Sequence, residues 1–108
     1  MVCAIIEKDD FVLCAQRSEK MALPFKWEFP GGKLEVNEFP EEALIREINE
    51  ELNIEIKIIE VLPIAEHSYV PEKTIQLIPF RCVIVNDGIP TPNEHSELRW
   101  MKKDDLFQ

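Results

Sequence analysis

The sequence predicts an α/β fold, in which a sheet of several strands packs against one amphipathic helix. Short apolar runs rich in β-branched residues recur along the chain and are separated by polar turn residues, as expected for strands. One segment, residues 40–52, instead spaces its apolar residues as a helix does. With 108 residues, of which 45% are hydrophobic, the chain can build one core. We therefore expect a single domain over residues 1–108.

The first part of the chain predicts a β-hairpin. The run VCAIIE at residues 2–7 and the run FVLCAQ at residues 11–16 are rich in strand formers, and the polar residues 8–10 lie between them. Residues 18–26 contain Pro24 and are expected to form a loop.

The helix predicted at residues 40–52 has recognisable ends. Pro40 suits the first turn, where its missing N–H is not needed, and two glutamates follow near the positive end of the helix dipole. Asn53 comes directly after the helix, where a left-handed conformation is often required. The expected buried face consists of Leu44, Ile45, Ile48 and Leu52.

The second half of the chain predicts three more strands, at residues 54–67, 75–85 and 97–101. Pro63 and Pro79 lie inside the first two and predict an irregularity in each. Residues 68–74 and 90–96 are expected to be loops, with a turn at residues 86–88. Residues 102–106 begin a turn or helix just before the chain stops.

Three carboxylates on the helix give the first indication of function. Glu47, Glu50 and Glu51 share one face, which flanks the apolar stripe. Like charges at this spacing repel one another by roughly 0.2–0.5 kcal/mol per pair. Oxygen ligands of this kind select a hard cation, Mg²⁺ with Mn²⁺ as a substitute. The alternative is a solvated acidic surface.

Charge and composition limit the classes of partner. A net charge of −9 argues against binding to nucleic acid, because the basic residues are too few to replace its counterions. The sequence has no 18-residue apolar run and no signal peptide, so we expect a cytoplasmic protein that makes no membrane contact. Cys3, Cys14 and Cys82 have no metal-site spacing and are expected to be small core residues.

The spacing of polar residues from Gly32 through Glu38, Arg46, Glu47, Glu50 and Glu51 resembles the signature of the Nudix hydrolases. The run WEFPGGKLE at residues 27–35 is similar to that of the MutT-type nucleoside triphosphate pyrophosphohydrolases. Asn53 departs from the glycine usual in the family, and Phe39 stands where a Ser or Thr cap is favoured. The resemblance implies a Nudix-like α/β/α sandwich with a mixed β-sheet. The second, C-terminal helix of that sandwich is missing from this sequence, which suggests a truncated or minimal member.

The resemblance also implies roles for individual residues. The Gly31 carbonyl, Glu47, Glu50, Glu51 and Glu94 would hold the metal. Glu50 or Glu94 would act as the base, with Glu97 as an alternative to Glu94. Arg46 would orient Glu47 or Glu38 through an ion pair. The residues expected near substrate are Arg17, Phe29 and Lys33.

Several aromatic and histidine residues have simpler explanations. Trp27 is expected to pack in the core or a lid. His67 and Tyr69 flank a loop and could face a nucleoside, but a lone histidine is more often structural. His95 is expected to be an exposed loop residue rather than a ligand.

The implied reaction is hydrolysis of nucleoside triphosphates, canonical or oxidised, to a nucleoside monophosphate and pyrophosphate. One alternative keeps the site but changes the substrate to ADP-ribose or a dinucleoside polyphosphate. Another is a nucleotide-binding regulatory module without activity. A homodimer is one way to cover a sheet face that lacks its second helix.

Overall fold

The computed structural model describes the backbone of residues 1–70 and 73–106 and the side chains of residues 1–66 and 76–105. Its elements, in chain order, are β1 (Val2–Lys8), β2 (Phe11–Gln16), β3 (Trp27–Glu28), β4 (Gly31–Gly32), α1 (Pro40–Leu52), β5 (Ile56–Val61), β6 (Ala65–Val70), β7 (Lys73–Ile84), β8 (Glu97–Lys102) and α2 (Lys103–Leu106).

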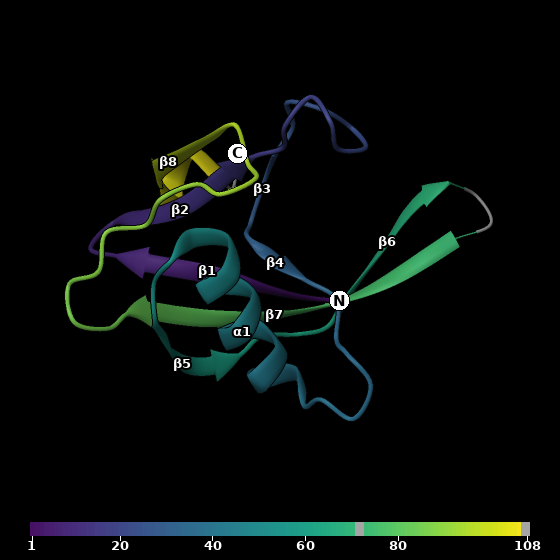
Figure 1. Cartoon of the computed structure of the whole chain (residues 1–108), viewed down its shortest axis with the longest axis horizontal. Helices are drawn as coiled ribbons and strands as arrows, with labels where there is room; N and C mark the ends of the chain where they lie inside the picture. Colours follow the sequence, from purple (N-terminus) through teal and green to yellow (C-terminus); the bar gives the residue numbers. More distant parts are fainter. Residues whose placement is uncertain (71–72, 107–108) are drawn as a thin grey trace.

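The centre of the fold is a mixed sheet, as the family resemblance implies. Strands β1 and β7 are parallel, with Val2 opposite Ile78 and Ile6 opposite Cys82. Strand β5 is antiparallel to β7, and the two-residue strand β4 is antiparallel to β1. In Figure 1, α1 crosses in front of β1, β7 and β5, so the long helix covers this part of the sheet.

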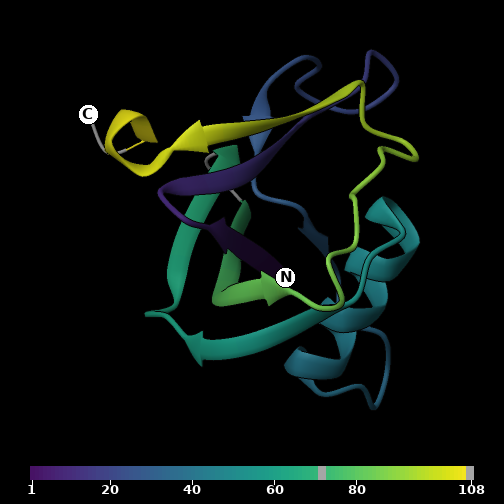
Figure 2. The same cartoon turned by 90° about the vertical axis from the view of Figure 1, so that its left-hand side faces the viewer.

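The predicted hairpin is confirmed, but its two strands soon part. Strand β1 pairs with β2 only beside the turn, at Glu7–Val12 and Lys8–Phe11. Strand β2 also pairs along its whole length with β8 and, at its end, with β3. Figure 2 shows β2 and β8 crossing above the region of β1, β7 and β5. The sheet therefore has two halves that open away from their shared hairpin.

Helix α1 ends as the sequence predicts. Asn53 adopts a left-handed conformation (φ 57°, ψ 36°), and its N–H donates to the Asn49 carbonyl. Phe39 at the other end provides no side-chain cap. The buried face differs at one position: Ile45 is 42% exposed, and Ala43 is buried instead. Ala43, Leu44, Ile48 and Leu52 pack together in the core. The core also includes Val2, Ile6, Leu13, Ile56 and Phe80.

The strand predicted at residues 54–67 is two strands, because Pro63 separates β5 from β6. The prediction of a loop at residues 68–74 is also wrong, since β6 extends to Val70 and β7 begins at Lys73. These two strands project together from the body of the molecule (Figure 1). The irregularity predicted at Pro79 is confirmed. Strand β7 pairs with β6 up to Leu77 and with β5 from Phe80 onward.

The C-terminal strand and the helix after it lie close to their predicted places. Strand β8 continues to Lys102, and α2 has four residues. Within the described residues α1 is thus the one long helix, and the mixed sheet behind it confirms the predicted fold class. None of the described helices combines the length and apolar character needed to cross a membrane.

Candidate active site

A pocket of about 670 Å³ lies between the two halves of the sheet, where β1 and β2 diverge. It brings together four residues that the sequence indicated for the site, Arg17, Phe29, Gly31 and Glu51. Its walls also include apolar and sulphur-containing side chains, among them Val2, Cys3, Cys14, Met21, Trp27 and Met101. The pocket thus combines an apolar lining with a few charged groups, which is typical of a small-molecule site.

The two glycines before the helix allow close packing on both sides of this strand. A Cβ at Gly31 would overlap the Val2 carbonyl oxygen and the Cys3 Cα of β1. A Cβ at Gly32 would overlap the Glu47 carboxyl group of α1. Glycine is therefore required at both positions, because β4 lies directly between β1 and the acidic face of α1.

Glu51 is the carboxylate of the acidic face that lines the pocket. Its Oε2 atom is buried and has no hydrogen-bond partner among the described residues. Burial raises the pKa of the Glu51 carboxyl to about 7; the charge of His95 opposes this, while Glu47, Glu28 and Glu94 add to it. A buried carboxylate without a partner is costly, so this atom is available for a ligand.

Arg46 connects the helix to the loop before it. Its Nε and Nη2 donate to the two oxygens of Glu38 at 2.8 and 3.0 Å, the two-pronged ion pair expected for arginine. Its Nη1 donates to Glu47 at 3.0 Å and to Glu50 at 3.3 Å, and Nη2 also reaches the Lys33 carbonyl. Hydrogen bonding to Arg46 lowers the pKa of Glu38 to about 2.

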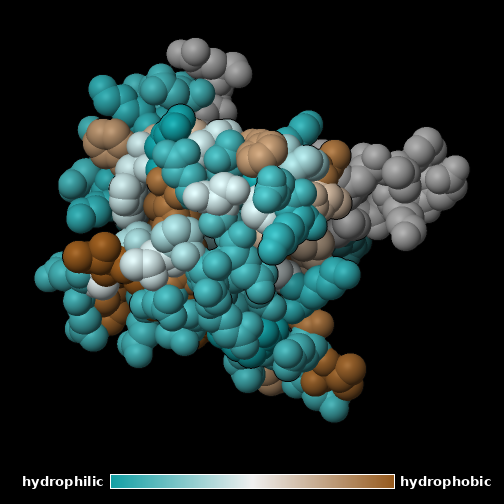
Figure 3. Space-filling view, turned by 45° about the horizontal axis from the view of Figure 1, so that its top comes forward, coloured by the Kyte–Doolittle hydropathy of each residue, from teal (hydrophilic) through white to brown (hydrophobic). Residues whose placement is uncertain are grey.

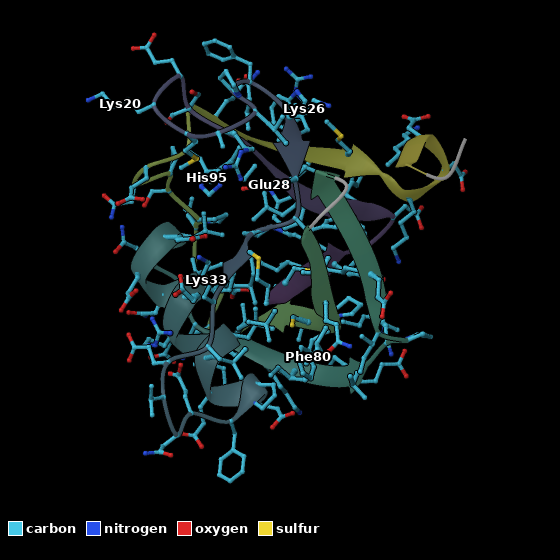
Figure 4. The ribbon with its side chains drawn as sticks, turned by 90° about the vertical axis from the view of Figure 1, so that its right-hand side faces the viewer. Lys20, Lys26, Glu28, Lys33, Phe80 and His95 are labelled. Carbon is cyan, nitrogen blue, oxygen red and sulfur yellow. The ribbon has the colours of Figure 1, made fainter. Side chains whose placement is uncertain are left out.

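Glu28 and His95 are two candidate functional residues that the sequence did not indicate. Glu28 accepts hydrogen bonds from Arg17 at 2.8 Å and from His95 at 2.9 Å, and both Glu28 and His95 line the pocket. Figure 4 shows His95 and Glu28 pointing toward one another. Burial raises the pKa of Glu28, but the hydrogen bonds from His95 and Arg17 outweigh it and lower the pKa overall.

The prediction of an exposed His95 is wrong. Its side chain is only 4% exposed, because the ring is drawn inward to Glu28. This hydrogen bond raises the pKa of His95 above its usual value, although burial opposes it. The available signal was that Glu28 belongs to the WEFPGGKLE run, but nothing local connects it with a histidine 67 positions away.

The remaining predicted residues lie outside the pocket wall. Glu94 is exposed and borders a second hollow with Asn93 and Ser96. Glu97 begins β8, and its carboxylate lies 3.6 Å from Arg99. The Lys33 side chain is exposed on the loop after β4 (Figure 4). The side chains of His67 and Tyr69 lie outside the described residues.

The described side chains contain no group of three or more histidine, cysteine, aspartate or glutamate residues arranged as a metal site. Glu47 and Glu50 are instead arranged around the Arg46 guanidinium. The donor chemistry still fits a hard divalent cation, since Glu51 Oε2 has no partner among the described side chains and the charges of Glu47 and Glu94 add to the raised pKa of Glu51. A cation at this place would offset the repulsion among these carboxylates.

Comparison with known proteins identifies the family. The NUDIX domain family model matches residues 1–108. The 8-oxo-dGTP diphosphatase of Proteus vulgaris is 44% identical over 73 residues, which cover 68% of this chain and 64% of that protein. The CTP pyrophosphohydrolase of Escherichia coli strain K12 is 36% identical over 110 residues, covering 100% of this chain and 78% of that protein. A solved MutT protein from Methanosarcina mazei Go1 has a TM-score of 0.84 at 28% identity, covering 97% of this chain and 77% of that one.

The match to the Proteus vulgaris protein spans less than two thirds of that relative, whereas the Escherichia coli relative matches along this whole chain. The family model and these relatives confirm what the signature segment after Gly31 indicates. The chain belongs to the Nudix hydrolase family.

Proposed function

We propose that this Nudix hydrolase cleaves nucleoside triphosphates, canonical or oxidised, to a nucleoside monophosphate and pyrophosphate. The observation that carries the proposal is the buried Glu51 Oε2 atom, which has no hydrogen-bond partner in the described part of the chain and lies in the wall of a pocket that also contains Arg17, Phe29 and Gly31. Two relatives support the substrate class, because the names of both refer to a nucleoside triphosphate, although they differ in the base.

Nudix hydrolases generally use divalent metal ions. We infer Mg²⁺ for this chain, with Mn²⁺ as a substitute, because the candidate ligands are all oxygen atoms. The ligands would be the Gly31 carbonyl, Glu47, Glu50, Glu51 and Glu94. When bound, the cation would neutralise phosphate charge and make the attacking water more acidic.

The protein side chains would position the reactants and move one proton. Glu94 or Glu50 would accept the proton from water. Glu97 is the weaker alternative, because its carboxylate is near Arg99 in the strand β8. Arg46 would hold Glu47 in place from the loop side, since it binds Glu47 and Glu38 together.

The substrate would be held from the pocket and from the loop after β4. Phe29 in the pocket wall would contact the base, and the exposed Lys33 on that loop would contact phosphate. Arg17 already donates to Glu28 and to the Ala22 carbonyl, so its orientation is set before substrate binds.

The function is tested with a panel of nucleotides in the presence of Mg²⁺. The panel contains ordinary and oxidised nucleoside triphosphates, ADP-ribose and dinucleoside polyphosphates, each with and without chelator. Formation of a nucleoside monophosphate and pyrophosphate that stops with chelator is the expected result. Turnover of ADP-ribose or dinucleotides alone would replace the proposed substrate class, and absence of any turnover would indicate a binding module.

A further inference from the structure

The loop that carries Glu94 is held to the rest of the protein on both sides of that residue. On the side before Glu94, the Asn93 N–H donates to the Glu51 carbonyl at 3.1 Å and Asn93 Nδ2 donates to the Glu50 carbonyl at 3.2 Å. The Thr91 N–H donates to the Leu52 carbonyl at 2.9 Å. These carbonyls belong to the last turn of α1, where no intrahelical donor is available to them.

On the side after Glu94, the attachment is to the sheet half that contains β2 and β3. His95 Nε2 lies 2.9 Å from Glu28 Oε2. Because the neighbouring hydrogen bonds favour ionised Glu28, Nε2 is the donor in this pair. The Ser96 N–H donates to the Gln16 carbonyl at 2.9 Å. Arg17 binds the second oxygen of Glu28, so Glu28 itself is held from two sides.

Glu94 therefore lies between two anchors that lead to different parts of the site. Asn93 attaches to the helix that carries Glu47, Glu50 and Glu51, and His95 attaches to the pocket wall through Glu28. The Glu94 side chain is itself exposed and would otherwise move with its loop. Misplacement of a reacting group by about 1 Å can cost 10²-fold in rate.

We propose that Asn93 and His95 are positioning residues, which attach the loop between β7 and β8 to α1 on one side and to β3 on the other, and so hold Glu94 beside the last turn of α1. The inference rests on the proposed function, because it takes Glu94 to be part of the site. Neither residue needs to touch substrate for this role.

Substitutions at His95 separate its two ring nitrogens. A glutamine amide can occupy the place of Nε2 and still donate to Glu28, whereas an asparagine amide is one methylene shorter and corresponds to Nδ1. We expect His95→Gln to keep kcat within about 3-fold and His95→Asn to lower it about 10-fold or more. The opposite order would overturn the proposal, because it would place the role of His95 at Nδ1, which is buried in the pocket wall without a partner among the described residues.

Asn93 is tested in the same way with a matched control. Asn93→Ala should lower kcat about 10-fold with little change in KM, since substrate contacts are retained. Asn49→Ala removes an exposed asparagine from α1 and should leave kcat unchanged. Equal kcat in both variants would exclude Asn93 from the proposal.

A double-mutant cycle shows whether His95 acts through Glu94. In a Glu94→Gln background, His95→Asn should cause no further loss of kcat, because the group that it positions is already neutral. A loss equal to that in the wild-type background would mean that His95 acts independently of Glu94, and the proposal would be wrong.

Hydrogen exchange gives a readout that does not depend on activity. The amides of Thr91, Asn93 and Ser96 are hydrogen-bonded and should exchange slowly in wild type and His95→Gln, but at least 10-fold faster in His95→Asn. Unchanged exchange in His95→Asn would refute the anchoring. If wild type hydrolyses no nucleotide, the proposed function fails, and the exchange rates alone decide the anchoring.

Discussion

Glu51 is the residue at which folding and function conflict most directly. Its carboxylate lies in the pocket wall, and one of its oxygens is buried without a partner among the residues that the structure describes. Burial raises the pKa of this carboxyl to about 7. A structural role would have been served better by an amide or an apolar side chain, because a buried charge without a partner opposes folding. The buried position of the Glu51 carboxylate is explained if the carboxylate binds a ligand.

Replacing Glu51 with glutamine should stabilise the metal-free protein above pH 7 and disable it. The folded-state pKa lies above the unfolded value near 4.3, so stability falls as pH rises through both values. After solvent screening of this partly exposed group, we expect Glu51→Gln to gain about 1–2 kcal/mol at pH 8, and less at pH 5. Turnover should fall at least ~10²-fold, since an amide is a poor Mg²⁺ ligand.

The measurement is urea unfolding in chelator at pH 5 and pH 8, together with kcat in Mg²⁺. Glu55→Gln serves as the control, because Glu55 is exposed just after the helix. A pH-independent difference from wild type would show that the Glu51 carboxyl is not the source of the effect, and wild-type turnover would remove it from the site.

Arg46→Lys should reduce turnover about 10-fold although the charge is kept. The guanidinium binds Glu38 with two nitrogens while a third nitrogen reaches Glu47, and a lysine ammonium cannot reproduce that geometry. Arg81→Lys is the matched control, because Arg81 also binds two glutamates, Glu7 and Glu60, but neither of them is a proposed metal ligand. Similar kinetics in the two variants would make Arg46 an ordinary surface residue.

Among the individual residues of the candidate site, the sequence indicates those whose positions follow from local spacing along the chain. Glu47 and Glu51 are recognisable because helical periodicity places them beside the buried stripe, and the ion pair of Arg46 with Glu38 spans eight positions. Glu28, Asn93 and His95 could not be found in this way. Their contacts join segments 43 and 67 positions apart, and only the tertiary structure brings those segments together.

Among the elements, the approach of β4 to α1 determines where Glu47 lies. Gly32→Ala would place its Cβ against the Glu47 carboxyl group, a flexible end that can move away. We expect a change in unfolding free energy within about 1 kcal/mol and a loss of turnover of ~10-fold or more. Unchanged turnover would show that the position of Glu47 is not critical.

Gly31→Ala provides the comparison, because its Cβ would meet backbone atoms of Val2 and Cys3 that cannot move without disturbing β1. Its unfolding free energy should fall by about 2 kcal/mol or more. Urea unfolding of both variants therefore separates displacement of a side chain from displacement of a strand.

Elements that are specified locally are the ones that the sequence predicts well. The helix has its own periodicity and terminal residues, and Asn53 adopts the left-handed conformation expected there. The partner of a strand is a non-local property. Pro63 and Pro79 each predict an irregularity, but they do not indicate which strands lie on either side, so the change of partner of β7 from β6 to β5 could not be predicted.

At the scale of the whole molecule, the charge of the protein has the same sign as the charge of its proposed substrate, a nucleoside triphosphate. The net charge is −9, and the face shown in Figure 3 is mainly hydrophilic, with small separate hydrophobic patches. Anion would repel anion unless cations intervene. Cys3, Cys14 and Cys82 are free and buried, as expected for small core residues.

Addition of Mg²⁺ should therefore raise the thermal stability of the protein in the absence of any nucleotide. Binding to the folded state alone stabilises it by RT ln(1 + [L]/Kd), which is about 1.4 kcal/mol at ten times Kd. For a domain of this size we expect Tm to rise by roughly 5–10 °C at pH 8. Sodium chloride at equal ionic strength should have a much smaller effect, because screening does not place a cation between Glu47 and Glu51. In Glu51→Gln most of the Mg²⁺-specific rise should disappear; a full rise there would locate the cation away from the pocket and would require a different set of ligands.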